Sequence, residues 1–130
     1  MALINYEQFA RRVKIVYDEI AEGLERDNSL PMPYSFQDIL FVFGKYFALY
    51  EKFLGREHPP ITNVKQIQRI ILAMPTIEDE NGEAFDILAE NYPDLMMQHF
   101  WTDYAEGCDY NINHFFSGKI RYYRYMETLY

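Results

Sequence analysis

The stretch SFQDILFVFGKYFALYEKFLG, residues 35–55, decides the fold. Its polar residues Asp38, Lys45 and Lys52 recur every seven positions, so they share one narrow stripe of a helix. Most other positions are apolar, and a helix that is apolar on most sides must be covered by neighbours. Ser35 is a typical N-cap, and Gly55 is typical of the residue that follows a helix. The stretch therefore predicts a buried central helix over about residues 35–54.

A membrane-spanning helix is the alternative for this stretch, because about 20 apolar residues are long enough to cross a bilayer. However, the segment also contains Asp38, Lys45, Glu51 and Lys52, whose insertion into hydrocarbon is expensive. A covered helix of a soluble protein is the favoured interpretation. We therefore expect no membrane partner.

Helical patterns also flank the central segment, because apolar residues recur there at spacings of three and four. The acidic TIEDENGE, residues 76–83, is predicted to be a loop: Asn81-Gly82 suits a hairpin turn, but Glu and Asp are poor strand formers. The sequence thus predicts one all-α domain over residues 1–130, a bundle of five to six helices around the central one. The flanking helices are expected at about residues 5–26, 63–74, 83–91, 93–104 and 111–129.

Cysteine usage and the N-terminal residues bear on the compartment. Cys108 is the only cysteine, so no disulfide can form within the chain. The opening MALINYEQF lacks the basic start, long apolar run and cleavage site of a secretory signal. We therefore expect a cytoplasmic protein of bacterial or phage type.

The net charge of −8 is distributed unevenly along the chain. Residues 1–69 hold nine acidic and nine basic side chains, whereas residues 70–118 hold ten acidic ones and no Lys or Arg. Such a field attracts basic surfaces and repels nucleic acids and anionic lipids. We expect a basic protein surface as the partner, bound through the acidic segment 76–94, although acids that only keep the domain soluble are the simpler alternative. The predicted contact residues are Glu78, Asp79, Glu80, Glu83, Asp86, Glu90 and Asp94.

Enzymatic chemistry would need a nucleophile with a base, a tuned carboxylate pair or a glycine-rich phosphate loop. The six glycines are scattered, and Ser29, Ser35 and Ser117 lie in no context that indicates activation. The sequence therefore predicts a non-enzymatic interaction protein without a cofactor. In style it resembles small acidic helical proteins of bacterial mobile elements and toxin-immunity systems, which implies an inhibitor, immunity or regulatory role.

A second interpretation concerns the C-terminal third of the chain, residues 95–124. A helix, a glycine-containing turn and the run YNINHFFSGKIRYYRY resemble the second half of a helix-turn-helix. The resemblance implies a DNA-binding transcriptional regulator, although the proposed recognition helix has no Arg or Lys of its own and the helix before it is acidic. The residues implied to face the groove are Tyr110, Asn111, Asn113 and His114, and those implied to meet phosphates are Lys119, Arg121 and Arg124.

Two further features of this region are left open by the sequence. His99, Asp103, Cys108 and His114 carry groups that bind zinc, but their spacing matches no standard site, so we predict no bound metal. Several tyrosines near the C-terminus would point in different directions on a helix, and they cannot all enter one core. A homodimer therefore remains an alternative partner. These tyrosines are Tyr122, Tyr123, Tyr125 and Tyr130.

Overall fold

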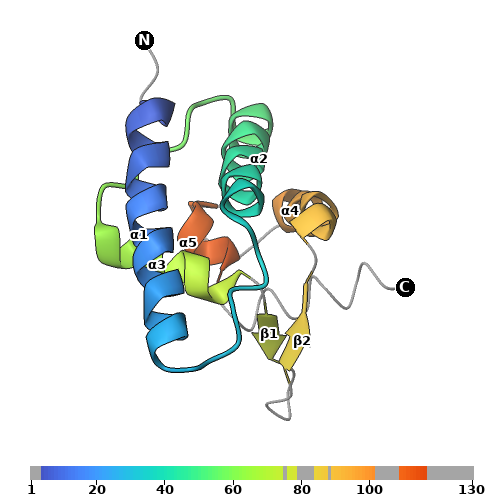
Figure 1. Ribbon diagram of the computed structural model, residues 1–130. Coiled ribbons are helices and arrows are strands. Elements are labelled where there is room, and N and C mark those ends of the chain that lie inside the picture. The colour runs from blue at the N-terminus through green and yellow to red at the C-terminus, as the bar shows by residue number, and fades with distance from the viewer. Residues whose placement is uncertain (1–3, 75, 79–83, 88, 102–108, 117–130) are drawn as a thin grey trace.

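The computed structural model describes residues 4–74, 76–78, 84–87, 89–101 and 109–116. Within these residues the chain forms five α-helices, one turn of 3-10 helix and one small antiparallel sheet (Figure 1). The prediction of a predominantly helical protein is confirmed. The elements in chain order are α1 (Tyr6–Arg26), α2 (Phe36–Leu54), α3 (Val64–Ala73), β1 (Thr76–Glu78), β2 (Ala84–Asp86), η1 (Ala89–Asn91), α4 (Tyr92–Trp101) and α5 (Ile112–Phe115).

Local signals set the ends of α2. The Ser35 hydroxyl accepts a hydrogen bond from the Asp38 N–H at 3.1 Å, and the Asp38 carboxylate accepts one from the Ser35 N–H at 3.0 Å. This reciprocal capping box satisfies two donors at the start of the helix. At the other end Gly55 adopts a left-handed backbone with φ of 69°, which residues with a Cβ rarely adopt. The predicted N-cap and terminating glycine are both confirmed.

Aromatic rings join α2 to its neighbours on two sides. Phe43 meets Phe9 of α1 edge-on, with ring centroids 5.0 Å apart, and Phe53 stacks on Phe100 of α4 at 5.4 Å. Such pairs are stabilising beyond the area they bury. The expected covering of the apolar circumference is wrong for Phe41, which is 44% exposed.

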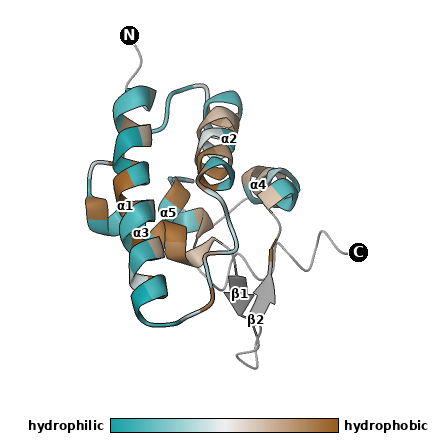
Figure 2. Cartoon of the chain, in the orientation of Figure 1, coloured by the Kyte–Doolittle hydropathy of each residue, from teal (hydrophilic) through white to brown (hydrophobic). Residues whose placement is uncertain are grey.

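Amphipathic packing explains α1 and α3. Hydrophilic and hydrophobic residues succeed one another along α1 (Figure 2), and the two helices contact each other. Each turns its apolar side inward, as spacings of three and four residues predict. The buried residues are Phe9, Val13, Val16 and Ile20 in α1 and Ile67, Ile70 and Ile71 in α3.

Hydrogen bonds from tyrosine hydroxyls join the segments that connect the helices and the hairpin. Tyr34 and Tyr92 are both buried, and each donates a hydrogen bond to the carbonyl of Met74 at the end of α3. The Tyr34 hydroxyl also reaches the carbonyl of Ile87, while the Tyr17 hydroxyl donates to the Tyr34 carbonyl at 2.7 Å. Buried carbonyls need such partners. The 27–35 connection is thereby fixed to the residues around the hairpin.

Replacing Tyr34 with phenylalanine should lower the free energy of unfolding by about 1–3 kcal/mol, because buried carbonyls lose a donor. Urea unfolding followed by circular dichroism would measure this. Tyr6→Phe is the matched control, since Tyr6 is 54% exposed. Equal losses in the two variants would contradict a role for the buried hydroxyl.

Two predictions for residues 76–91 are wrong. The predicted loop at 76–83 begins with β1, and the predicted short helix at about 83–91 is replaced by β2 and η1. The strands pair antiparallel with Thr76 opposite Asp86, Ile77 opposite Phe85 and Glu78 opposite Ala84. Backbone pairing overrides the weak strand propensity of the acidic residues, as context often does for strands. Asn81-Gly82 lies outside the described residues.

The remaining helical predictions concern the C-terminal third. The predicted helix at about 93–104 corresponds to α4, and the predicted helical region at about 111–129 corresponds to α5 at its start. Residues 102–108 and 117–130 lie outside the described part of the chain. Among the helices described, none combines the length and the apolar character needed to cross a bilayer.

Candidate functional site

Four of the predicted partner-binding acids lie in described elements, and we call them the hairpin–α4 acids: Glu78, Asp86, Glu90 and Asp94. The hairpin register places Glu78 opposite Ala84 and Asp86 opposite Thr76. Thr76 and Glu78 are two residues apart on β1, so they share a face, and paired positions share a face too; the register therefore puts Glu78 and Asp86 on the same face of the hairpin. The other predicted members, Asp79, Glu80 and Glu83, lie outside the described residues.

The hairpin–α4 acids continue from the sheet into the next helix. Glu90 in η1 and Asp94 in the first turn of α4 are both exposed. A carboxylate in a first helical turn interacts favourably with the positive end of the helix dipole, so Asp94 also stabilises α4. The chain from the hairpin to α4 therefore presents anionic positions in succession, two of them with exposed side chains.

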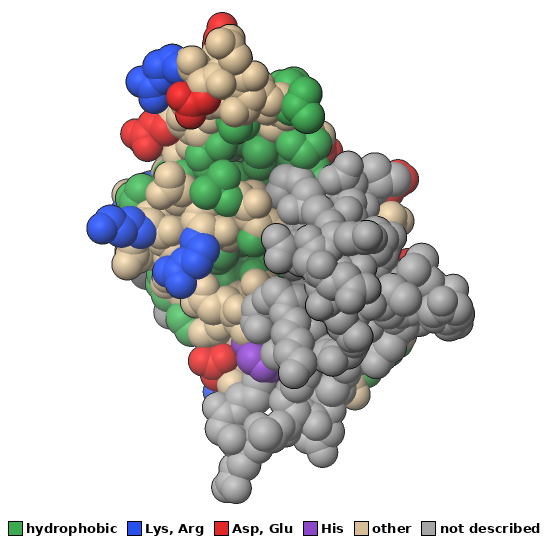
Figure 3. Space-filling model, turned by 90° about the horizontal axis from the view of Figure 1, so that it is seen from below, with side chains coloured by type: hydrophobic (Ala, Val, Ile, Leu, Met, Phe, Trp, Pro, Cys, Tyr) green, Lys and Arg blue, Asp and Glu red, His purple; other side chains and the backbone are tan. Residues whose placement is uncertain are grey.

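The described basic residues belong to other elements. Each of them lies in α1, in α2, in the connection that follows α2 or in α3. On the face seen from below, the Lys and Arg side chains lie towards the left of the view, with hydrophobic side chains between them and Asp and Glu side chains beside them (Figure 3). Positive charge is thus carried by the N-terminal helices, whereas the described part of residues 70–118 contributes none.

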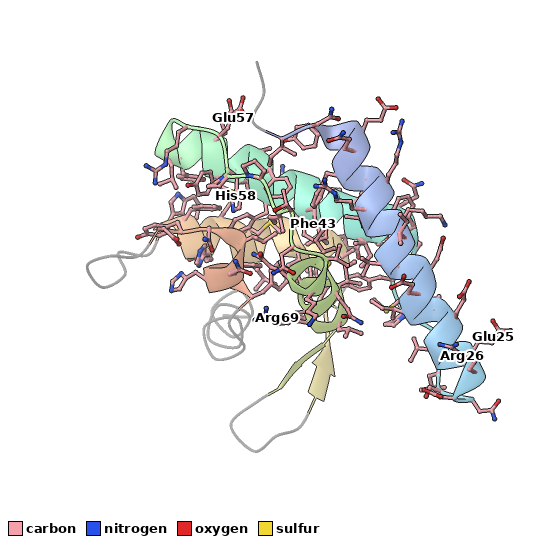
Figure 4. All side chains as sticks on the ribbon, turned by 90° about the vertical axis from the view of Figure 1, so that its left-hand side faces the viewer. Glu25, Arg26, Phe43, Glu57, His58 and Arg69 are labelled. Atoms are coloured by element: carbon pink, nitrogen blue, oxygen red, sulfur yellow. The ribbon has the colours of Figure 1, made fainter. Side chains whose placement is uncertain are left out.

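A buried histidine that the sequence analysis did not single out lies between α2 and α3. His58 is 4% exposed and points into the molecule, whereas its neighbour Glu57 points outward (Figure 4). The His58 ring lies against Tyr50 and Phe47, with ring centroids 4.7 and 4.9 Å away. The signal for His58 in the sequence is weak, because HPP is typical of a break between helices.

Two hydrogen bonds define the state of the His58 ring. Its Nδ1 lies 2.7 Å from the carbonyl oxygen of Pro59, and its Nε2 accepts a hydrogen bond from the N–H of Ile112 at 3.0 Å. A carbonyl needs a donor and an N–H needs an acceptor, so the ring is neutral and carries its proton on Nδ1. Burial lowers the pKa of His58, and the Pro59 hydrogen bond and the Asp109 charge oppose this less strongly.

The residues implied by a helix-turn-helix lie at the start of α5. The side-chain oxygen of Asn111 accepts hydrogen bonds from the N–H groups of Asn113 and His114 at 3.0 and 3.4 Å, so Asn111 caps α5. Its amide nitrogen donates to Asp109 at 3.0 Å. Asn113 is exposed and His114 and Tyr110 are half-buried. Lys119, Arg121 and Arg124 lie outside the described residues.

The candidate zinc ligands are only partly described. The rings of His99 and His114 lie together, with centroids 5.2 Å apart, and His99 is fully buried. Asp103 and Cys108 lie outside the described residues. In the part of the chain that is described, no three His, Cys, Asp or Glu side chains are grouped so that they could hold a metal ion.

No family model, curated protein or solved structure matches this chain. Function must therefore be inferred from the arrangement of its own residues. The described residues combine exposed carboxylates after the hairpin, at Glu90 and Asp94, with a neutral histidine held inside, at His58.

Proposed function

We propose that this protein is a non-enzymatic acidic interaction protein that binds a basic protein surface through segment 76–94. One observation supports this most strongly: charge is separated along the fold. The hairpin, η1 and α4 carry acids without a Lys or Arg, while the bases among residues 1–69 lie in the N-terminal helices and the connections between them. Charge that is not balanced locally can act on a partner.

Electrostatic attraction is the proposed mode of recognition. Acidic residues at successive positions of the hairpin, η1 and α4 would steer a Lys- and Arg-rich surface into contact and fix its orientation. Glu90 and Asp94 are exposed and available for this contact. Because the same basic surface would also attract nucleic acid, the protein would compete with nucleic acid for its partner. An inhibitor, immunity or regulatory role in the cytoplasm would follow.

The proposal treats α2 as the central helix that supports the binding elements. Seven residues of α2 are buried, and both α4 and η1 contact it. Rigid helices hold a binding surface more reproducibly than loops do. We therefore expect the partner to meet acids whose positions change little on binding.

Neutralising the hairpin–α4 acids tests the proposal. The variant Glu78→Gln/Asp86→Asn/Glu90→Gln/Asp94→Asn should fold and should associate with the partner about tenfold more slowly at low salt, because steering is lost. Affinity capture with the wild-type protein identifies the partner, and stopped-flow mixing or surface plasmon resonance then measures the rate.

A control variant with the same change in net charge separates location from total charge. Glu19→Gln/Glu22→Gln/Glu25→Gln/Asp27→Asn neutralises four exposed acids at the end of α1 and just after it. We expect this control to associate nearly as fast as the wild type. Equal slowing in both variants would contradict a defined site, and salt-dependent retention of the wild type on DNA would favour the regulator instead.

A further inference from the structure

We propose that His58 is an acid-sensitive latch that holds residues 109–116 against the helices beneath them. In the neutral ring, Nε2 accepts the hydrogen bond from the Ile112 N–H. Protonation adds a hydrogen to Nε2, so this nitrogen becomes a donor that faces the Ile112 N–H and can no longer accept its hydrogen bond. The bond is then lost, and the segment that contains α5 is released. This inference does not depend on the proposed partner.

The bonded group explains why the latch matters to α5. Ile112 is the first residue of α5, and the first N–H groups of a helix have no partner within the helix. Asn111 caps the next two N–H groups, of Asn113 and His114. His58, which is 54 residues away in sequence, supplies the acceptor for Ile112. The ring therefore completes the capping of α5 from a different part of the chain.

The charged and titratable groups around His58 do little to stabilise its protonated form. From α2 it faces the phenol rings of Tyr46 and Tyr50, and the Tyr50 hydroxyl accepts a hydrogen bond from the Arg56 Nε at 3.3 Å. The neighbouring Glu57 points outward. The Asp109 carboxylate acts on His58 electrostatically, but it already accepts hydrogen bonds from the backbone and side chain of Asn111.

Release of the segment would uncover apolar surface. Phe115 is fully buried against Tyr46 and Tyr92, with ring centroids 5.4 and 6.0 Å apart, and Tyr110 stacks on Phe100 at 6.2 Å. The Tyr46 hydroxyl also donates to the Tyr110 carbonyl. These contacts keep the segment in place at neutral pH. Acidification would therefore convert a covered face of α2 and α4 into an exposed one.

The pH range follows from the sign of the shift. The pKa of His58 is lowered in the closed state, whereas in the released state it returns towards its ordinary value of 6.5. The latch is therefore fully effective above pH 6.5 and weakens as the pH falls from there towards the closed-state pKa. Over that interval the opening equilibrium rises by about tenfold per pH unit, because opening takes up one proton.

Hydrogen exchange of the Ile112 amide between pH 7.5 and 5 measures the opening. In the wild-type protein, protection at Ile112 should fall by about tenfold per pH unit below 6.5, after correction for intrinsic exchange. The amide of Ile67, buried in α3, should keep its protection, which separates local release from global unfolding. Nitrogen NMR of the His58 ring should show a proton on Nδ1 and none on Nε2 at pH 7.

Three variants sharpen the test. His58→Phe fills the ring space without an acceptor, so Ile112 should exchange fast at every pH. His114→Gln alters the half-buried histidine of α5 and should keep the wild-type pH dependence. Asp109→Asn removes a charge that raises the pKa of His58, so the pH dependence should extend to lower pH. Constant protection at Ile112 from pH 7 to 5 in the wild type, or a proton on Nε2 at pH 7, would overturn the latch even if His58→Phe fails to fold.

Discussion

Phe43→Ala is expected to lower the free energy of unfolding by about 3–5 kcal/mol, because a large buried ring is removed and a cavity remains. Phe43 is 1% exposed and points inward among the packed helices (Figure 4). Its ring contacts Phe9 of α1 and lies 6.1 Å from Phe47 on its own helix. Loss of the ring removes contacts from both helices, and urea unfolding would measure the change.

Phe41→Ala supplies the matched control for this prediction. Phe41 lies two residues earlier on α2 and is 44% exposed, so its removal should cost about 1 kcal/mol or less. The comparison holds the residue type and the helix constant. Similar losses for the two variants would show that α2 is rotated relative to the arrangement described.

Phe115→Ala is also expected to lower the free energy of unfolding by about 3–5 kcal/mol, provided that α5 and the core unfold together. Phe115 is fully buried, and its ring contacts Tyr92, Tyr46 and His99, the last at 5.2 Å. Without that ring, Ile112 is the one other buried residue of this four-residue helix. Unfolding by urea and amide exchange at Ile112 would report the global and local parts of the loss.

Asn113→Ala is the matched control for Phe115→Ala, because Asn113 is exposed and lies in the same short helix. Its removal should change the free energy of unfolding by less than about 0.5 kcal/mol. If Phe115→Ala were as mild as this control, residues 109–116 would not be part of the core.

Local sequence patterns predicted the helices and many of their ends. Ser35, Asp38 and Gly55 mark the ends of α2 with side chains and backbone conformations that depend only on near neighbours. Asn5 and Asn63 act in the same way at α1 and α3, accepting from the N–H groups of Gln8 and Lys65. Such interactions involve residues close in sequence, so they can be predicted without a tertiary structure.

Features that depend on distant residues could not be predicted. The strands β1 and β2 form because their backbones pair, which outweighs the low strand propensity of Glu78 and Asp86. The exposure of Phe41 depends on which distant segments pack on α2. His58 accepts a hydrogen bond from the Ile112 N–H, 54 residues away in sequence, and no local sequence pattern predicts such a contact. The acidic segment was visible in the sequence, but the shared hairpin face needed the strand register.

The association rate with the captured partner, measured as a function of salt concentration, shows whether the hairpin–α4 acids steer binding. For the wild type, the rate should fall steeply as salt rises, since salt screens charges beyond about 8–10 Å. The variant that neutralises the hairpin–α4 acids should start slower and respond weakly, while the α1 control should behave like the wild type. If the association rate of the variant without the hairpin–α4 acids fell with salt as steeply as that of the wild type, these acids would not be the binding site.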